Sequence, residues 1–240
     1  MDLTRNAMEY IAELSAPNTV EHEGEVFADK KLYRIDKELR ATPITVHTLT
    51  SFLDYIVSGV DPVKGRMIVH VVSPERVELL SALDSDRKRE TLMVAEAMIP
   101  EFSYGHFISH ENFLIALQSK FLPTEDRDIL FRFAGTVESG SVAQYGDDGV
   151  TQKATVKTGV ASKGDAIVPN PVVLKPFRTF TEVDQPESSF VFRMRDDRGE
   201  VSCALFEADG GAWRNAAIHN IAEFILDALD GMSERVTVIN

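Results

Sequence analysis

The sequence contains a single cysteine, Cys203, among its 240 residues. One cysteine excludes an intramolecular disulfide and any zinc site built from several cysteines, and it suits a reducing compartment. No apolar run approaches the roughly 18 residues that a membrane-spanning helix needs. The first residues, MDLTRNAMEYIAEL, lack the charged-then-apolar pattern of a secretion signal. We therefore expect a cytoplasmic protein that does not enter a membrane.

Basic residues are scarce: 25 Lys and Arg face 38 Asp and Glu, which gives a formal net charge of −13. Proteins that bind nucleic acid without sequence preference gain affinity by neutralising phosphates, so they usually carry the opposite sign. A local basic groove is still compatible with an acidic total. The simplest interpretation is that the charge keeps the protein soluble. A generic DNA-coating role is disfavoured.

Catalytic and nucleotide-binding signatures are also missing. The sequence holds no Walker P-loop and no GxGxxG, HExxH or GxSxG motif. We therefore predict no catalytic residue and no cofactor, and the sequence favours a binding protein over an enzyme without deciding the question.

Apolar periodicity predicts groups of strands that helices interrupt. Three apolar runs between residues 66 and 99, separated by short turns, predict an antiparallel meander. The third run, Thr91 to Ile99, also contains good helix formers, but the short turns around it favour a strand. Three helix caps are expected before runs of helical period: Thr48 or Thr50 for the first, Ser109 for the second and Thr124 for the third.

The stretch from Pro171 to Gly231 carries the clearest local signals, and its first part, Pro171 to Phe180, is expected to form a strand. An alternating strand, Ser189 to Arg195, is followed by the turn sequence DDRG and by a returning strand. A helix from Ala212 to Leu229 follows a glycine turn. Strands in groups with helices between them are typical of α+β proteins rather than of βαβ units. We therefore expect an α+β fold of mixed, largely antiparallel sheets with packed helices, including the meander over 66–99 and a C-terminal hairpin plus helix.

The length fits one large domain or two small ones. A Gly-, Ser- and Asp-rich segment, Glu138 to Gly149, is the best candidate for a mobile loop. It separates an N-terminal α+β region, 1–137, from a C-terminal region with the hairpin and helix, 150–240. We expect these regions to form one compact domain or two tightly packed halves.

Two carboxylate pairs have the i, i+2 spacing that places side chains on one face of an extended chain: Glu182 with Asp184, and Glu207 with Asp209. Such pairs are suited to holding Mg²⁺, and they define a candidate metal site. The more ordinary explanation is that Asp209 caps the helix of Trp213 and that the other carboxylates are solvated.

Four basic residues, Lys175, Arg178, Arg193 and Arg195, are concentrated for so acidic a chain. With aromatic residues nearby in sequence, they define a candidate strip for contacts to phosphate or nucleic acid. The competing explanation is that they pair with local acids on a solvated sheet face.

His106 and His110 are four residues apart, but the expected cap at Ser109 leaves His106 outside the helix, so a shared metal is disfavoured. We expect Cys203 to be a buried, inert thiol and Trp213 to be a core anchor.

The C-terminal half resembles the YfdQ-like family of phage and prophage proteins. The resemblance rests on NPVVLKPFRTFTEVDQPESSFVFRMR (Asn170 to Arg195) and CALFEADGGAWRNAAI (Cys203 to Ile218), with TVHTLTSFLDY (Thr45 to Tyr55) as a strand-then-helix segment. The family is a domain of unknown function whose genes lie near phage recombination and replication functions. The resemblance therefore implies an intracellular role during infection, in the host cytoplasm, and transfers no active-site residue.

Three functional hypotheses follow. The first is a non-enzymatic phage accessory protein that binds a protein partner of recombination, replication or host defence, or a second copy of itself; an acidic chain favours a basic partner. The second is a single-stranded DNA-binding or annealing protein, because the strands of 66–99 followed by the helix after Ser109 give a β-β-β-α order, an argument by fold analogy. The third is a metal-dependent nuclease that uses the four carboxylates.

Overall fold

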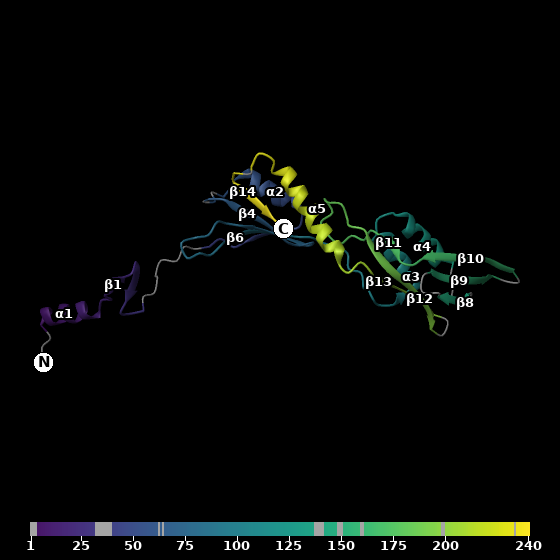
Figure 1. Ribbon diagram of the computed structural model, residues 1–240, viewed down its shortest axis with the longest axis horizontal. Coiled ribbons are helices and arrows are strands. Elements are labelled where there is room, and N and C mark those ends of the chain that lie inside the picture. Colours follow the sequence, from purple (N-terminus) through teal and green to yellow (C-terminus); the bar gives the residue numbers. More distant parts are fainter. Residues whose placement is uncertain are drawn as a thin grey trace. The chain divides into compact units, whose positions relative to one another are not determined.

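The structure is a computed structural model that describes residues 4–31, 40–61, 63, 65–136, 142–147, 151–158, 161–197, 200–232 and 234–240. The chain forms two compact units, Met1–Arg40 and Ala41–Asn240. Figure 1 shows the elements of both units coloured along the sequence.

The first unit consists of a helix and a β-hairpin: α1 (Arg5–Ser15), β1 (Thr19–His22) and β2 (Glu25–Ala28). The hairpin is closed at its base because the backbone N–H of Asn18 donates to Oδ1 of Asp29 over 2.8 Å. So small a unit buries little, and its large apolar side chains are exposed, namely Met8, Tyr10, Ile11, Leu14, Val20, Val26 and Phe27.

The second unit contains the remaining elements. In chain order they are β3 (Ile44–Val46), α2 (Leu49–Ser58), β4 (Met67–Ser73), β5 (Arg76–Leu80), β6 (Thr91–Glu96), β7 (Ile108–Ser109), α3 (His110–Ser119), α4 (Glu125–Thr136), β8 (Val142–Asp147), β9 (Thr151–Thr158), β10 (Ala161–Pro169), β11 (Val172–Leu174), β12 (Ser188–Asp197), β13 (Glu200–Glu207), α5 (Ala212–Ala228) and β14 (Val236–Ile239). The described strands of this unit form three sheets, ordered β14-β4-β5-β6-β3, β11-β12-β13-β7 and β10-β9-β8. Among the residues that the structure describes, the strand pairs are antiparallel except β14 with β4 and β3 with β6. The predicted α+β fold is confirmed.

The five-stranded sheet contains the predicted meander. β4, β5 and β6 are consecutive antiparallel neighbours, and the third run is a strand, as expected. Alternation along β4 buries Met67, Val69 and Val71, which share one core with α2 and α5. Figure 1 shows both helices beside this sheet.

The predicted helix caps are confirmed by their hydrogen bonds. Of the two candidates for the first cap, Thr48 rather than Thr50 is the N-cap of α2, because its Oγ1 accepts from the N–H of Ser51 over 3.2 Å. The helix ends at Gly59 in the left-handed conformation. Oγ of Ser109 accepts from Asn112, and Oγ1 of Thr124 accepts from Arg127 over 3.1 Å.

The four-stranded sheet contains the predicted hairpin, β12 with β13. Phe190, Phe192 and Met194 alternate into a second core that α3 and α4 also line, and Cys203 is fully buried there. The expected burial of the Cys203 thiol is confirmed, and this burial raises its pKa to about 12. The hairpin plus the helix α5 therefore stands as predicted, although Arg198 and Gly199 of the turn lie outside the described residues.

Strands from both predicted regions share sheets. β14 pairs with β4 in one sheet, and β13 pairs with β7 in another, so 1–137 and 150–240 are joined by backbone hydrogen bonds. Within the segment predicted as a loop, Val142–Asp147 forms β8; the rest of that segment lies outside the described residues.

One local expectation was wrong. The strand expected from Pro171 to Phe180 is only β11, because the chain beyond Leu174 turns into a loop held by side-chain hydrogen bonds. The N-cap residue of α5 is Gly211, and the carboxylate of Asp209 accepts from the N–H of Gly211 over 3.0 Å and from that of Trp213 in the first turn of the helix.

Candidate functional site

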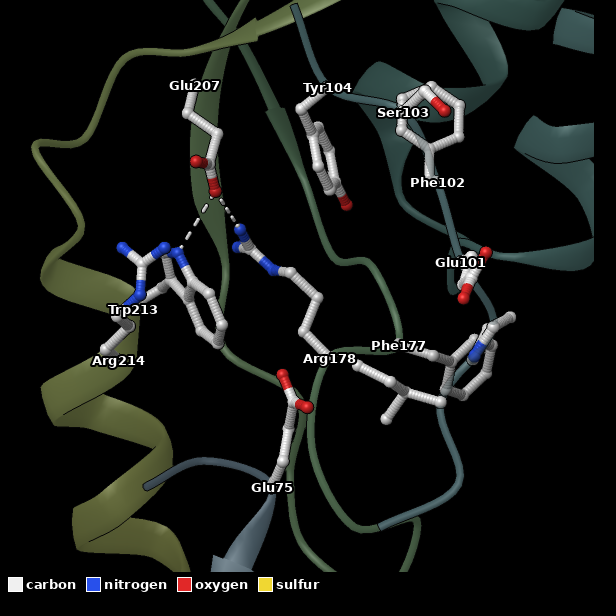
Figure 2. A pocket seen from close by; sticks show the side chains of 12 residues that line it. Glu75, Glu101, Phe102, Ser103, Tyr104, Phe177, Arg178, Glu207, Trp213 and Arg214 are labelled. Carbon is white, nitrogen blue, oxygen red and sulfur yellow. Dashed lines mark hydrogen bonds and ion pairs between the residues drawn. The ribbon is translucent and has the colours of Figure 1, made fainter. Parts of the chain in front are cut away.

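A pocket of about 360 Å³ lies in the second unit where five segments meet. The turn between β4 and β5 supplies Glu75, and the segment after β6 supplies residues 99–104. The loop after β11, the end of β13 and the start of α5 complete the lining. Figure 2 shows the side chains that line it.

The loop between β11 and β12 is fixed by one buried amide, that of Gln185. Its Oε1 accepts from the backbone N–H groups of Arg178, over 2.9 Å, and of Thr179, over 3.2 Å. Its Nε2 donates to the carbonyl oxygen of Phe180 over 2.8 Å. Gln185 is 2 % exposed, so water cannot reach these polar groups, and the hydrogen bonds of the amide satisfy them instead. The backbone of Arg178 is thereby held in place.

Arg178 is the centre of the site, although it is only 4 % exposed. Its Nη1 donates to Oε1 of Glu207 over 2.7 Å, and its Nη2 donates to Oγ of Ser188. The Ser188 hydroxyl in turn donates to Oδ2 of Asp209 over 2.7 Å. The Nε of Arg178 is buried and has no hydrogen-bond acceptor among the residues that the structure describes. A buried charge of this kind needs such pairing, because desolvation alone is costly.

Three aromatic rings surround the Arg178 guanidinium. Its central carbon lies 4.0 Å from the ring centre of Trp213, 5.5 Å from that of Phe190 and 5.8 Å from that of Tyr104. The guanidinium of Arg214 also contacts Trp213, at 4.7 Å. Figure 2 shows Arg178 between Tyr104 and Trp213, with Arg214 on the other side of the indole. Cation–π attraction therefore supplements the ion pair with Glu207.

Burial and charge shift the pKa values of several groups in the site. Burial lowers the pKa of Arg178, while Glu207 and Asp209 act in the opposite direction. Burial raises the pKa of Tyr104 to about 12, so its phenol is protonated at neutral pH. Burial also tends to raise the pKa of Asp209, but hydrogen bonds from Ser188, Gly211 and Trp213 outweigh it and hold that pKa below its usual value.

The mouth of the pocket carries an excess of negative charge. Glu75 and Glu101 are both exposed, and neither carboxylate has a hydrogen-bond or ion-pair partner within the described part of the chain. Since Arg178 and Glu207 neutralise each other, the lining leaves these two carboxylates against one cation, Arg214. The pocket therefore favours a positively charged group.

The four basic residues predicted from the sequence do not form one strip. Lys175 pairs with Asp184, Nζ to Oδ1, over 3.0 Å, and Arg178 is buried in the pocket. Arg193 and Arg195 lie on the other face of β12 from its buried side chains. Two of the four residues, Lys175 and Arg178, therefore lie in the loop after β11, and the other two lie on strand β12. Contact with nucleic acid stays a prediction.

The four predicted metal-binding carboxylates have partners of their own. Oε1 of Glu182 accepts from the N–H of Thr50 over 3.3 Å, at the start of α2, and Asp184 binds Lys175. Glu207 and Asp209 are brought into one network, through Arg178 and Ser188. Across residues 4–240, apart from those whose placement is not described, no three His, Cys, Asp or Glu side chains gather in a way that could hold a metal. The metal site stays a prediction that this arrangement does not support.

The histidines make separate contacts. Nδ1 of His106 lies 3.0 Å from the carbonyl oxygen of Tyr104, and Nε2 of His110 lies 2.6 Å from that of Ala134. His106 precedes the helix, as the cap at Ser109 predicted.

Sequence reasoning missed much of the pocket. Glu75, Glu101 and Tyr104 line it, and Gln185 supports it, yet none of them was identified; Phe177 was identified only as an aromatic residue beside the candidate basic strip. The one available signal was that Phe102 and Tyr104 fall between the strand expected to end at Pro100 and the helix expected after Ser109. Aromatic residues in loops more often cover a core, so this signal is weak.

Comparison with known proteins gives no match: no family model, no curated protein and no solved structure corresponds to this chain. The resemblance to the YfdQ-like family therefore stays a prediction. Among the described residues, no helix has the length and apolar character to cross a membrane.

Proposed function

We propose that this chain is a non-enzymatic binding protein whose pocket receives a basic segment of a protein partner. The observation that carries the proposal is a pocket with aromatic walls and two carboxylates, Glu75 and Glu101, that lack a partner among the described residues. Aromatic faces and carboxylates both attract cations, the first through their quadrupole and the second through charge.

The charge of the whole chain supports the same conclusion. With a formal net charge of −13, the protein attracts basic partners at a distance and repels acidic ones. The lining of the pocket also carries excess negative charge, as the whole chain does. The pocket can therefore supply a local contact for a basic partner that the chain attracts.

The family resemblance supplies the biological setting of the proposal. It points to a phage accessory protein that acts in the host cytoplasm, on a partner from recombination, replication or host defence. A second copy of the chain is the alternative partner.

Trp213 offers a direct test, because it is the only tryptophan of the chain and lines the pocket. We expect short acetylated and amidated Gly/Ser peptides that carry arginine or lysine to change its fluorescence saturably at low salt. The double variant Glu75→Gln/Glu101→Gln should weaken this binding about tenfold or more, since each lost charge contact is worth roughly 1 kcal/mol.

Asp227→Asn is the matched control, because it removes an exposed carboxylate from the other end of α5, about 21 Å from Trp213 at 1.5 Å per residue. It should bind like the wild type. Absence of binding by both peptides, or equal binding by the double variant and the wild type, contradicts the proposal. If binding is seen, a pull-down from infected cells that loses its basic partner only with the double variant identifies that partner.

One observation favours a second candidate, a single-stranded DNA-binding protein. The guanidinium of Arg195 lies 4.1 Å from the ring centre of Phe107, beside Arg193 on the same strand face. Arginine next to a ring that is only half-buried, as Phe107 is, is a platform on which bases stack. A gel shift on single-stranded DNA at low salt, lost in Arg193→Ala/Arg195→Ala, would favour this function; no shift at low salt removes it.

A further inference from the structure

We infer that the group held by this pocket is an arginine side chain, and that lysine is discriminated against. The inference rests on the proposed function, since it names the chemistry of the basic segment that the pocket receives. Three features of the lining lead to it, namely its flat walls, its separated carboxylates and the cost of dehydrating the guest.

The pocket already contains two guanidinium groups, and both contact Trp213. The central carbon of Arg178 is 4.0 Å and that of Arg214 is 4.7 Å from the indole centre. These distances match stacking of a planar cation on an aromatic face, which guanidinium achieves better than a compact ammonium. Tyr104 and Phe177 supply further rings in the same lining. Both sides of the indole are occupied by these two cations, so a third planar cation would stack on the other rings of the lining, those of Tyr104 and Phe177.

The two carboxylates come from different segments of the chain. Glu75 lies in the turn between β4 and β5, whereas Glu101 follows β6. In Figure 2 the Glu75 carboxylate points toward the middle of the pocket, and Glu101 projects from another wall beside Phe102. A guanidinium has five N–H donors spread around a plane and can reach carboxylates on two sides. An ammonium concentrates its charge at one point.

Dehydration separates the two guests further. The pocket is about 360 Å³ and opens to solvent on the side of the exposed Glu75 and Glu101, so a guest loses the part of its hydration shell that faces the rings. Guanidinium is hydrated more weakly than ammonium, and its loss of water is less costly. Arginine therefore gains more from the rings and loses less to dehydration.

Replacing Arg214 tests whether the bound group is a cation or an anion. It is exposed on the first turn of α5 and lines the same pocket, so its positive charge opposes the entry of a cation. Arg214→Gln should strengthen binding of an arginine peptide about two- to fivefold. The same change should weaken binding if the true guest is an anion.

The experiment compares Gly/Ser peptides that carry arginine, lysine or citrulline, an uncharged analogue of arginine, by Trp213 fluorescence and by calorimetry. We expect the arginine peptide to bind wild-type protein about five- to tenfold more tightly than the lysine peptide, as cation–π differences of about 1 kcal/mol imply. The citrulline peptide should show no saturable binding.

The outcomes separate the two proposals. Equal affinity for arginine and lysine, both weakened by Glu75→Gln/Glu101→Gln, overturns arginine selectivity and keeps the basic-partner function. Binding of neither peptide, or binding that the double variant leaves unchanged, overturns both. Weaker binding of the arginine peptide by Arg214→Gln also overturns the inference, because it indicates an anionic guest.

Discussion

Arg178 and Trp213 donate to the same oxygen, Oε1 of Glu207, and stack on each other at 4.0 Å. Nη1 of Arg178 is 2.7 Å and Nε1 of Trp213 is 3.1 Å from that oxygen. The three residues come from the loop after β11, the first turn of α5 and the end of β13. These contacts connect the three segments at the pocket, so a substitution at any of the three residues should lower the free energy of unfolding.

Replacing Arg178 should destabilise the protein. Arg178→Lys keeps the charge but loses the planar group that meets Glu207, Ser188 and the rings, and we expect a loss of about 2–3 kcal/mol in the free energy of unfolding. This loss is small for the disruption of a buried ion pair, because Glu207 is partly exposed. Urea denaturation measures the free energy of unfolding of the variant and of the wild type. The exposed Arg195→Lys should change stability by less than about 0.5 kcal/mol; equal effects of the two changes would contradict the role of Arg178.

Gln185→Glu tests the amide that fixes the loop. The change is isosteric, and the oxygen that accepts from Arg178 and Thr179 is retained. The donor to the carbonyl of Phe180 is replaced by an acceptor, so two oxygens face each other in a buried place. We expect a loss of about 2 kcal/mol or more by thermal or urea unfolding. Gln118→Glu, on the exposed side of α3, is the control and should be nearly neutral; a neutral Gln185→Glu would show that the loop does not depend on this amide.

Gly211→Ala and Gly59→Ala form a matched pair. Both glycines have positive φ, +83° and +59°, so an added Cβ costs about 1 kcal/mol at either position. At Gly59 nothing lies within 4 Å of that Cβ, whereas at Gly211 it would be 2.6 Å from Nη1 of Arg214. Arg214 must then move away, and we expect the fluorescence of Trp213 to change in Gly211→Ala alone. Identical spectra for both variants would place Arg214 elsewhere in solution.

Two tyrosines make stability fall at high pH. Burial raises the pKa of Tyr55 and of Tyr104 to about 12, and the hydrogen bond of Tyr55 to Asp61 adds to its shift. In the unfolded chain both phenols release their protons near the ordinary value of 10, so the unfolded state loses protons first. Their contribution is complete below about pH 10 and disappears as the pH rises toward 12.

A spectrophotometric titration of the tyrosinate band measures this shift. Tyr55 and Tyr104 should contribute a late component to the ionisation of the folded protein, and this component should shrink in Tyr55→Phe and in Tyr104→Phe. Denaturant should remove the delay. If neither Phe variant changes the late component, the assignment to these phenols is wrong.

Local sequence patterns determined most of the fold. The alternation of Phe190, Phe192 and Met194 and the caps at Thr48, Ser109 and Thr124 were read from residues close together in the chain. Such patterns depend on the period of the backbone and on a few neighbouring side chains, which the sequence contains in full. The α+β class, the meander and the C-terminal hairpin with its helix followed from them.

The pocket was decided only by the tertiary structure. Glu75, Tyr104, Arg178 and Trp213 are far apart in the chain and meet because the sheets and loops bring five segments together. The sequence named Arg178 as a surface contact, whereas its burial against Trp213 depends on rings and a carboxylate from other segments. Long-range packing sets burial, ion pairing and pKa, and none of these has a local period that a sequence pattern can show. The sequence by itself therefore determined the elements and the acidic charge, and the tertiary structure determined the site.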